Sequence, residues 1–489
     1  MDKNILHEQL LIDGKRCPSL SGRTSSIINP ANSTLLAEVA EGGAEDIAVA
    51  VESAHRAFDS RSPWRKMNSR ERTRALLRLS VLIRDHADEL SLLESQNTGK
   101  PIRDARDEVN LAADCFEFYA GAINKVGGQT IPVAARGVSM TFREPVGVCG
   151  LIVPWNFPIA ITSWKVAPAL SMGNVVVVKP ASQTPLTALR VGELALEAGV
   201  PPGVFNVVTG SGSVAGEALV RHPLVRKISF TGSTEAGSQV MRLAADDIKR
   251  VTLELGGKSA NLVFADADLE RALRSAASSL LGNAGQDCCA RSRLLVEKSI
   301  YENFVGKLTE LFQKVQVGDP LDEQTEMGPL ISKSHREKVE SYVQVGKAEG
   351  ASLETGGGRP EDGATANGSF LNPTLFADVQ PTMRIFQEEI FGPVLCVTPF
   401  KDETEAIALA NDSLYGLSGS IWTRDIERAL RVARAVQTGV LSINSGNSVH
   451  LEAPFGGVKR SGVGRELGMA VLDHYSEMKS VFIHVGNNS

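Results

Sequence analysis

The sequence predicts a folded α/β protein with two domains, each built on a parallel sheet. Its 489 residues exceed the ~100–200 residues of a usual domain. Hydrophobic residues make up 43% of the chain and charged residues 22%, so sizeable cores can form. Short β-rich runs alternate with helical patterns over most of the length, and this alternation is typical of a parallel α/β sheet.

The first half of the chain begins with helices and continues as alternating strands and helices. Asn68-Ser-Arg-Glu71 has the form of a capping box and opens an amphipathic helix that runs through Ile83. A second helix is expected over Asp104–Ala122. The expected buried strands are Val175–Val178, Phe205–Val208, Lys227–Phe230 and Asn261–Phe264, and the helices between them include Thr187–Ala198 and Ser213–His222.

The second half repeats the alternation, and the boundary between the two series is expected near Glu254–Gly257. Two other segments, Gly127–Glu144 and the tail Glu477–Val485, have the pattern of extended strands set apart from both domains. The strands expected in the second series are Ser292–Val296, Leu395–Phe400 and Ser418–Trp422, and its helices are Tyr301–Val315, Lys333–Glu349 and Thr404–Asn411.

Composition and charge exclude several classes of function. The 51 Lys and Arg residues are outnumbered by 57 Asp and Glu, so the chain lacks the basic surface that nucleic acid or an anionic membrane attracts. Prolines, asparagines and a lysine interrupt the apolar stretch Val146–Val178, which falls short of the ~20 continuous apolar residues of a membrane helix. The N-terminal residues show no export pattern, so a cytoplasmic location is expected. Six irregularly spaced cysteines indicate a reduced protein without a metal site.

Two glycine-rich turns between predicted strands and helices have features of a dinucleotide site. Gly210-Ser-Gly-Ser-Val-Ala215 fits the relaxed fingerprint G-x-G-x-x-A. Phe230-Thr-Gly-Ser-Thr-Glu-Ala-Gly237 places glycines and hydroxyl groups at a helix N-terminus, where free N–H groups and the helix dipole favour phosphate. Taken alone, each turn is equally well explained as a tight support turn.

Three further residues are candidates for covalent catalysis. Cys288 and Cys289 form a pair of thiols in Gly285–Ala290, although most free cysteines are buried and inert. Glu254 is a carboxylate in an apolar stretch, a setting that raises the pKa of a general base, but a lone Glu is more often salt-bridged or solvated. Asn156 lies between two prolines, where its amide either supports a turn or stabilises an oxyanion.

Together the motifs resemble the signature of the aldehyde dehydrogenase superfamily, and the resemblance covers essentially the whole chain. The 34-residue spacing between Glu254 and Cys288, which is 288 − 254, also suits that family. The segments that carry the resemblance are PWNFP at 154–158, KPASQTP at 179–185, FTGSTEAG at 230–237, LELGGK at 253–258, GQDCCA at 285–290, EEIFGPV at 388–394, the stretch ending in Asn444, and PFGGVKRSGVGRE at 454–466.

The resemblance implies a role for each candidate catalytic residue. Cys288 is the expected nucleophile, and Cys289 is its neighbour. The Asn156 side chain and the Cys288 backbone N–H would hold the oxyanion that forms when the thiolate attacks an aldehyde. Loss of a hydride to the nicotinamide ring would leave a thioester, and Glu254 would activate the water that hydrolyses it. Because members that transfer the acyl group to coenzyme A usually lack this glutamate, the expected product is a free carboxylic acid.

The resemblance also implies a coenzyme site with one departure from the common pattern. NAD-preferring members commonly have a Glu where this chain has Ser182. A carboxylate would repel the 2′-phosphate of NADP, whereas Ser182 can donate a hydrogen bond to it and Lys179 can add positive charge. The coenzyme is therefore expected to be NAD or NADP. The other positions expected to contact it are Pro154, Trp155, Gly212, Phe230, Gly232, Ser233, Leu255, Glu389 and Phe391.

Substrate choice is expected to depend on aromatic walls and two carboxylates. Phe157, Trp164 and Phe455 match family positions around the substrate tunnel. Asp287 and Glu452 would add negative charge near it, and the DCC pattern resembles aminoaldehyde and betaine-aldehyde members. An ω-amino or trimethylammonium aldehyde is the leading hypothesis. The alternatives are a broad-specificity aliphatic or aromatic aldehyde dehydrogenase, or a semialdehyde dehydrogenase, with both carboxylates serving as ordinary polar residues.

Domain organisation and assembly follow from the same resemblance. Residues 1–126 and 145–254 are expected to form a Rossmann-like coenzyme domain, 255–462 an α/β catalytic domain, and 127–144 with 475–489 a β-arm for oligomerisation. The edge strands of such an arm must be paired or covered, so a homodimer or homotetramer is expected. Two rivals stay open: a non-catalytic nucleotide-binding or structural relative, and an acyl-transferring or esterase-like enzyme that uses the same cysteine without hydride transfer.

Overall fold

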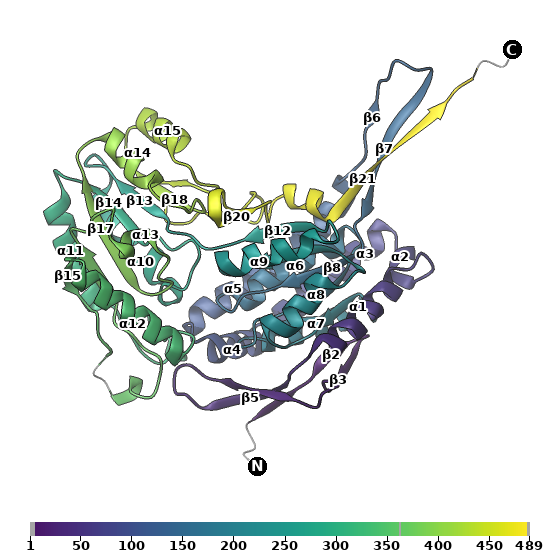
Figure 1. Ribbon diagram of the computed structural model, residues 1–489, viewed down its shortest axis with the longest axis horizontal. Helices are drawn as coiled ribbons and strands as arrows, with labels where there is room; N and C mark the ends of the chain where they lie inside the picture. Colours follow the sequence, from purple (N-terminus) through teal and green to yellow (C-terminus); the bar gives the residue numbers. More distant parts are fainter. Residues whose placement is uncertain (1–4, 361–362, 487–489) are drawn as a thin grey trace.

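Two large sheets organise the chain, and one of two smaller sheets projects away from them (Figure 1). The computed structural model describes residues 5–360 and 363–486. Residues 1–4, 361–362 and 487–489, which the sequence assigns to the coenzyme domain, the catalytic domain and the arm, lie outside the described residues. Each large sheet has its own cluster of buried apolar side chains, which accounts for the division into two lobes.

The first large sheet has eight strands in the order β20-β12-β11-β8-β9-β10-β2-β3, and the five from β12 to β10 run parallel. β8 (Val148–Ile152) and β9 (Val175–Lys179) are buried throughout, as expected for apolar strands covered on both faces. β12 (Arg250–Glu254) ends at Glu254, so this carboxyl lies at the edge where parallel α/β sheets bind ligands. The remaining strands are β2 (Leu10–Ile12), β3 (Lys15–Cys17), β10 (Phe205–Val207), β11 (Val225–Thr231) and β20 (Gly462–Val463).

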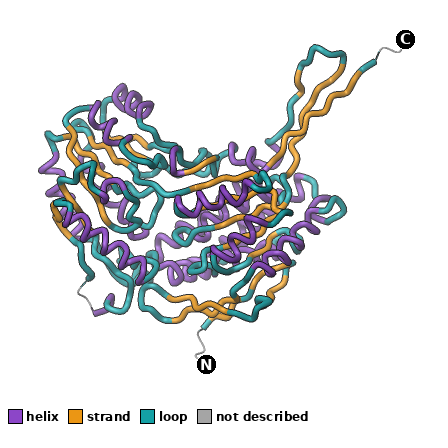
Figure 2. The backbone as a smooth tube through the Cα atoms, in the orientation of Figure 1, coloured by secondary structure: helices purple, strands orange, loops and turns teal. Residues whose placement is uncertain are grey.

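Two groups of helices pack beside this sheet, and Figure 2 shows them alternating with its strands. The predicted capping box is confirmed, because the Asn68 side chain accepts the Glu71 N–H and the Glu71 carboxylate accepts the Asn68 N–H. The helix predicted over Ser213–His222 instead begins with a π-helical turn (Gly212–Gly216). One group comprises α1 (Ala44–Phe58), α8 (Glu217–Arg221) and α9 (Thr234–Ala245); the other comprises α3 (Ser69–Asp85), α4 (Ala87–Thr98), α5 (Ile102–Ala122), α6 (Pro158–Ser171) and α7 (Leu186–Glu197).

The short helix α2 (Pro63–Lys66) contacts α1, and β1 (Leu6–Glu8), β4 (Thr24–Ile28) and β5 (Leu35–Ala40) form a separate three-stranded sheet.

The second large sheet has seven strands in the order β15-β16-β17-β14-β13-β18-β19, and only the β15–β16 pair is antiparallel. The strand predicted at Asn261–Phe264 belongs here, as β13 (Ala260–Val263), and the predicted alternation of strands and helices is confirmed. The other strands are β14 (Arg293–Glu297), β15 (Ser352–Thr355), β16 (Thr374–Ala377), β17 (Val394–Phe400), β18 (Gly419–Trp422) and β19 (Ser442–Ile443). The helices are α10 (Leu269–Leu281), α11 (Tyr301–Lys314), α12 (Lys333–Ala348), α13 (Arg384–Gln387), α14 (Glu403–Asn411) and α15 (Ile426–Ala435).

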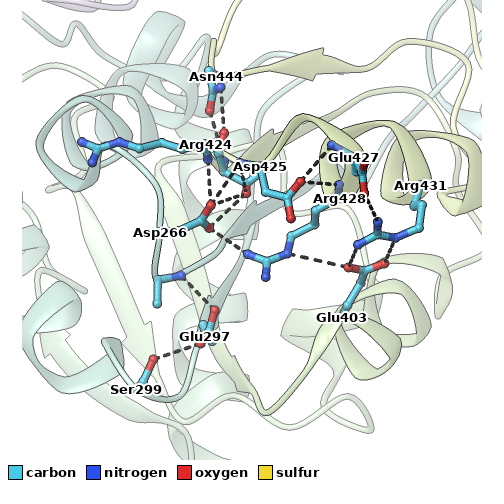
Figure 3. Close-up of polar contacts among 12 residues, drawn as sticks. Asp266, Glu297, Ser299, Glu403, Arg424, Asp425, Glu427, Arg428, Arg431 and Asn444 are labelled. Carbon is cyan, nitrogen blue, oxygen red and sulfur yellow. Dashed lines mark hydrogen bonds and ion pairs between the residues drawn. The ribbon is translucent and has the colours of Figure 1, made fainter.

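A polar cluster ties the ends of three strands of this second sheet together (Figure 3). The Asp266 carboxylate accepts the Asp425 N–H, the Thr423 hydroxyl and the Arg428 guanidinium at 2.8–3.1 Å. The Asn444 side chain accepts the Thr423 N–H at 3.1 Å and donates to its carbonyl oxygen at 2.9 Å. These contacts position the start of the segment 444–449, which returns toward the cysteine pair.

The extended segments predicted at 127–144 and in the tail pair with each other in the projecting sheet (Figure 1). β21 (Ser476–His484) pairs antiparallel with β7 (Gly137–Pro145) along nine residue pairs, and β6 (Thr130–Ile131) adds a short third strand. Phe142, Met478 and Phe482 expose their side chains on this arm. Assignment of the arm to oligomerisation stays a prediction, as do the domain boundaries. Among the described residues, no helix combines the length and the apolar composition needed to cross a bilayer.

Candidate active site

The loop that carries the cysteine pair joins α10 to β14 through a left-handed turn. Asn283, Ala284 and Gly285 have φ values of 50°, 54° and 71°, and the first two are unusual for residues with a side chain. The Asn283 side chain donates to the Asn156 carbonyl oxygen at 2.9 Å, which holds the turn against the other lobe. A Cβ atom at Gly285 would lie 2.2 Å from the Gly392 carbonyl oxygen, so the backbones approach closely here. This packing offsets the strain of the turn and places Cys288.

Cys288 is half-buried and faces a cavity of about 240 Å³ between the two lobes. The pKa of its thiol is raised well above the usual value, first by contact with the Cys289 thiol and then by burial. The cavity brings together residues that are far apart in the sequence. The sequence-predicted residues that line it with Cys288 are Pro154, Trp155, Asn156, Gly232, Ser233, Leu255, Glu389 and Phe391.

Asn156 is fixed through both its backbone and its side chain, and one N–H of its side-chain amide has no hydrogen bond among the described residues. α6 begins with Pro158, a residue favoured in the first turn, so the preceding loop ends directly beside the cysteine loop. The Asn156 carbonyl oxygen accepts the Lys100 ammonium at 3.1 Å, and its side-chain amide donates to the Gln286 carbonyl oxygen at 3.0 Å. A primary amide has two N–H groups, so the second can donate to an oxyanion on a group bound to Cys288.

Glu254 is a buried carboxyl with no hydrogen bond among the described residues. It is 4% exposed, and neither carboxyl oxygen has a partner. Burial raises the pKa of Glu254 well above its usual value, and the Glu466 carboxyl raises it further. The nearby Lys165 ammonium is already bound to Glu466 and Ser229 at 2.8 and 2.9 Å. A carboxyl with a raised pKa and free oxygens is suited to accept a proton from water.

Glu389 and Phe391 form another wall of the cavity. The Glu389 carboxylate accepts the Gly257 N–H at 3.0 Å, and burial raises its pKa to about 7. A Cβ atom at Gly256 would lie 2.1 Å from a Glu389 carboxylate oxygen, so a glycine is needed for this close approach. Phe391 has a left-handed φ of 60°, and its ring meets Trp155 edge-on at 5.2 Å between centroids.

Two of the residues predicted to contact the coenzyme line a second cavity, of about 300 Å³. Gly212 and Phe230 lie there with the apolar side chains of Val220, Val240 and Leu243, which suit a flat ring system. Ser233 caps α9, because its hydroxyl oxygen accepts the Ala236 N–H at 3.2 Å. The predicted coenzyme residues other than Lys179 and Ser182 therefore divide between the two cavities.

Lys179 and Ser182 both donate hydrogen bonds to backbone carbonyl oxygens. The buried Lys179 ammonium donates to the carbonyl oxygens of Pro180 and Gly210 at 2.6 and 3.0 Å, and burial lowers its pKa to about 8. The Ser182 hydroxyl donates to the same Gly210 oxygen at 3.0 Å. Because that donation uses its only hydrogen, Ser182 can donate to a 2′-phosphate only after this bond breaks.

None of the five predicted substrate residues lines the Cys288 cavity. The rings of Trp164 and Phe455 meet edge-on at 5.5 Å between centroids, and the Phe157 ring lies 4.5 Å from the Lys100 ammonium. The Asp287 carboxylate accepts the Cys289 N–H at 2.8 Å, and burial raises its pKa. Glu452 is exposed. The two predicted carboxylates thus differ: one supports the cysteine loop and the other faces solvent.

Comparison with known proteins identifies the family. The model of the aldehyde dehydrogenase family matches residues 18–481. The chain belongs to the aldehyde dehydrogenase family. A betaine aldehyde dehydrogenase of Bacillus subtilis is 46% identical over 479 residues, which are 98% of this chain and 97% of that protein. The structure of an aldehyde dehydrogenase from Bacillus cereus in complex with NAD⁺ matches with a TM-score of 0.96 and 43% identity, over 98% of this chain and 97% of that one.

A betaine aldehyde dehydrogenase from Staphylococcus aureus, also solved with NAD⁺, matches with a TM-score of 0.96 and 41% identity, over 98% of this chain and 95% of that one. The predicted family and fold are therefore confirmed, and the chain is an oxidoreductase that acts on aldehydes.

The aldehyde dehydrogenase cavity also contains residues that the sequence did not single out. Thr231 and Gly256 are neighbours of predicted residues. His335 and Lys338 come from α12, and their i, i+3 spacing puts both on one face of that helix. His335 contacts the Phe391 carbonyl oxygen at 2.7 Å. In the sequence, only the i, i+3 spacing of His335 and Lys338 was visible. No motif indicates that this helix packs against a site formed by other parts of the chain.

Proposed function

We propose that this aldehyde dehydrogenase oxidises an aldehyde to the carboxylic acid with NAD, through a covalent adduct on Cys288. The observation that carries the proposal is the meeting of Cys288, Asn156 and Glu389 in one cavity of about 240 Å³, with the unpartnered carboxyl of Glu254 at the edge of the adjoining sheet. A nucleophile, an oxyanion donor and a base are the groups that acyl-forming cysteine chemistry requires.

The coenzyme fits the two cavities. Glu389 offers a carboxylate that accepts hydrogen bonds from ribose hydroxyl groups, and the apolar cavity that Phe230 lines suits the adenine ring. NAD supplies the hydride acceptor when it is bound. Because the Ser182 hydroxyl already donates to Gly210 and related structures contain NAD⁺, NAD is the proposed coenzyme. NADP is tolerated only where the Ser182 bond breaks.

The first half-reaction forms the adduct. The Cys288 sulfur attacks the aldehyde carbon, and the carbonyl oxygen becomes an oxyanion. The free N–H of the Asn156 side chain and the Cys288 backbone N–H stabilise it. Asn156 is fixed by Lys100 and Asn283, so these donors need little reorganisation as the charge develops.

The second half-reaction hydrolyses the thioester that remains on Cys288. Glu254 accepts a proton from water, and the resulting hydroxide attacks the thioester carbon. Its raised pKa makes the carboxylate a stronger base than an exposed glutamate. The absence of a side chain at Gly456 leaves space for this carboxyl, because a Cβ atom there would lie 2.5 Å from a Glu254 oxygen.

The substrate is an ω-amino or betaine-type aldehyde, with a broad aliphatic or aromatic range as the second candidate. The first is supported by the name of the Bacillus subtilis relative. The second is supported by Asp287 and Glu452, since neither offers a free carboxylate at the cavity. The exposed apolar side chains of the arm support a homodimer or homotetramer, because a partner subunit would cover them.

To test this proposal, the absorbance of the reduced nicotinamide is measured over time, once with NAD and once with NADP. The aldehydes are betaine aldehyde, 4-aminobutyraldehyde, succinate semialdehyde, and simple aliphatic and aromatic aldehydes, with Cys288→Ala as the inactive control. A preference for the cationic aldehydes supports the first candidate, and equal turnover of the uncharged ones supports the second. Absence of turnover with every aldehyde would favour a non-catalytic relative, and ester hydrolysis without nucleotide would favour an esterase.

A further inference from the structure

Three charged side chains are buried together beside the loop that carries Asn156. Glu94 lies in α4, Lys100 in the turn that follows it and Glu108 in α5, which packs against both α4 and α6 (Figure 1). Their exposed fractions are 0%, 2% and 5%, and the Lys100 ammonium binds the Glu108 carboxylate. Burial lowers the pKa of Lys100 to about 8, so the ammonium is charged at neutral pH. Because burying charge is costly, such a cluster needs further polar partners.

The partners of the two carboxylates are in the first turn of α6. This helix begins at Pro158, and its N-cap residue makes no side-chain hydrogen bond. The Glu94 carboxylate accepts the Ile159 N–H at 3.2 Å. The Glu108 carboxylate accepts the Ala160 N–H at the same distance. These N–H groups have no acceptor within the helix, and the helix dipole favours negative charge at this end. Carboxylates from two other helices therefore cap α6.

Lys100 extends this anchor to Asn156. Its ammonium donates to the Asn156 carbonyl oxygen at 3.1 Å and lies 4.5 Å from the centre of the Phe157 ring. The same carbonyl oxygen accepts the Asn283 side-chain amide at 2.9 Å, and that amide also donates to the Gln286 carbonyl oxygen at 3.2 Å. Because the Asn156 side chain donates to the same Gln286 oxygen at 3.0 Å, these bonds link the backbone of Asn156 to its side chain in a closed ring.

We propose that the Glu94–Lys100–Glu108 cluster positions the oxyanion donor, with Lys100 as the positioning residue that acts on Asn156. The two carboxylates fix the start of α6, and Lys100 ties the Asn156 carbonyl group to that fixed point. Loss of the Lys100 bond leaves this oxygen with the Asn283 amide as its partner among the described residues, so the Asn156 peptide and side chain gain freedom. An oxyanion donor acts through its geometry, and a displacement of about 1 Å can cost about 100-fold in rate.

The inference rests on the proposed function, because it takes Asn156 as the donor to an oxyanion on Cys288. It differs from a purely structural role for the cluster. In both cases, loss of Lys100 leaves two buried carboxylates without their cation and lowers the melting temperature. Only positioning makes the catalytic effect of Lys100 depend on the Asn156 side chain, so the two residues must be varied together.

The experiment is a double-mutant cycle on the first half-reaction. Wild type, Lys100→Met, Asn156→Ala and the double variant are mixed with saturating NAD and a limiting amount of the aldehyde that the wild type oxidises best. Reduced nicotinamide is followed through a single turnover. Lys100→Met, which nearly keeps the length of Lys without its charge, is expected to slow this turnover about tenfold or more, and Asn156→Ala about 100-fold or more. The double variant is expected to be as slow as Asn156→Ala and no slower.

Three further measurements separate positioning from damage to the fold. The dissociation constant of NAD, obtained from quenching of tryptophan fluorescence, is expected to be unchanged in Lys100→Met. Lys100→Arg keeps the charge and is expected to restore most of the single-turnover rate. Lys249→Met is the matched control, because Lys249 is also a buried ammonium, bound to the carbonyl oxygens of His222 and Val225. It is expected to lower the melting temperature and leave the single-turnover rate unchanged.

A second cycle uses 4-nitrophenyl acetate, without aldehyde or coenzyme. An ester also acylates a thiol through an oxyanion, so the same coupling between Lys100 and Asn156 is expected in the acylation rate. If Lys100→Met fails to fold, Glu108→Gln takes its place in both cycles, because it removes the charge that binds Lys100 and keeps the shape of the side chain.

Two results would overturn the inference. One is an unchanged single-turnover rate in Lys100→Met. The other is a double variant that is slower than Asn156→Ala by the full factor that Lys100→Met costs the wild type, because independent effects multiply. An enzyme that oxidises no aldehyde but shows the coupling in the ester cycle would contradict the proposed function and leave the inference standing. An enzyme whose Cys288 reacts with neither substrate would overturn both.

Discussion

Replacement of Glu254 by Gln separates the two half-reactions of the proposed mechanism. The side chain is 4% exposed, and both carboxyl oxygens are without hydrogen bonds among the described residues. Gln has nearly the same shape, so the change leaves no cavity and breaks no hydrogen bond among the described residues. It removes only the group that accepts a proton from water. Adduct formation on Cys288 is therefore expected to survive, while hydrolysis of the thioester is expected to slow.

The expected magnitude follows from the single role left to Glu254. A general base contributes typically about 10²–10⁴-fold, which is about 3–5 kcal/mol of activation free energy. Because burial raises the pKa of Glu254, the carboxylate forms only as pH rises, so the wild-type steady-state rate is expected to increase through that pKa. The Gln variant is expected to lose this increase.

Stability provides an independent check on the same substitution. A carboxyl whose pKa is raised in the folded state favours folding at pH values below its unfolded pKa, and that contribution is lost as pH rises through the folded value. Gln cannot ionise, so Glu254→Gln is expected to melt at the same temperature as the wild type or higher at alkaline pH. A much lower melting temperature would show that Glu254 makes a structural contact.

The assay is rapid mixing of enzyme, aldehyde and NAD with detection of reduced nicotinamide. Glu254→Gln is expected to show a burst equal to the concentration of active sites, followed by a steady state at least 100-fold slower than that of the wild type. Glu452→Gln makes the same chemical change at an exposed position and is expected to match the wild type. A burst-free variant with normal turnover would refute the assignment of Glu254 as the base.

Four further changes test the coenzyme site, the cysteine loop and the arm. Glu389→Gln is expected to abolish the fall in KM for NAD that the wild type shows as pH rises through about 7, since only the ionised carboxylate accepts two hydroxyl hydrogen bonds; steady-state kinetics from pH 6 to 8 check it. Gly257→Ala places a Cβ atom 2.4 Å from the Cys288 carbonyl oxygen and is expected to lower kcat/KM at least tenfold. Ser182→Glu is expected to suppress turnover with NADP and spare turnover with NAD, as measured with each coenzyme at equal concentration. Phe482→Lys charges a side chain that is 47% exposed on the arm and is expected to reduce the molecular mass in sedimentation without unfolding the chain.

Much of the fold was predictable because its signals are local. The valine run at Val175–Val178 indicates a buried parallel strand without reference to any other part of the chain, and the Asn68–Glu71 pattern specifies a helix start through contacts three residues apart. The catalytic candidates Cys288, Glu254 and Asn156 were likewise visible, because their motifs combine reactive groups with glycines and prolines. Local hydrogen bonding and local steric limits are properties of a short stretch of sequence.

What the sequence left open depends on contacts between distant segments. The Ser182 hydroxyl can donate a hydrogen bond to a phosphate, but it already donates one to the Gly210 carbonyl oxygen. Asp287 has the right charge to bind a cationic substrate, but its carboxylate accepts a hydrogen bond from the Cys289 N–H. His335 and Lys100 carry no motif and acquire their surroundings only when α12 and the loop before α6 fold against the rest of the site. Hydrogen-bond capacity is limited and burial changes the cost of charge, so the tertiary structure decides which groups remain free to react.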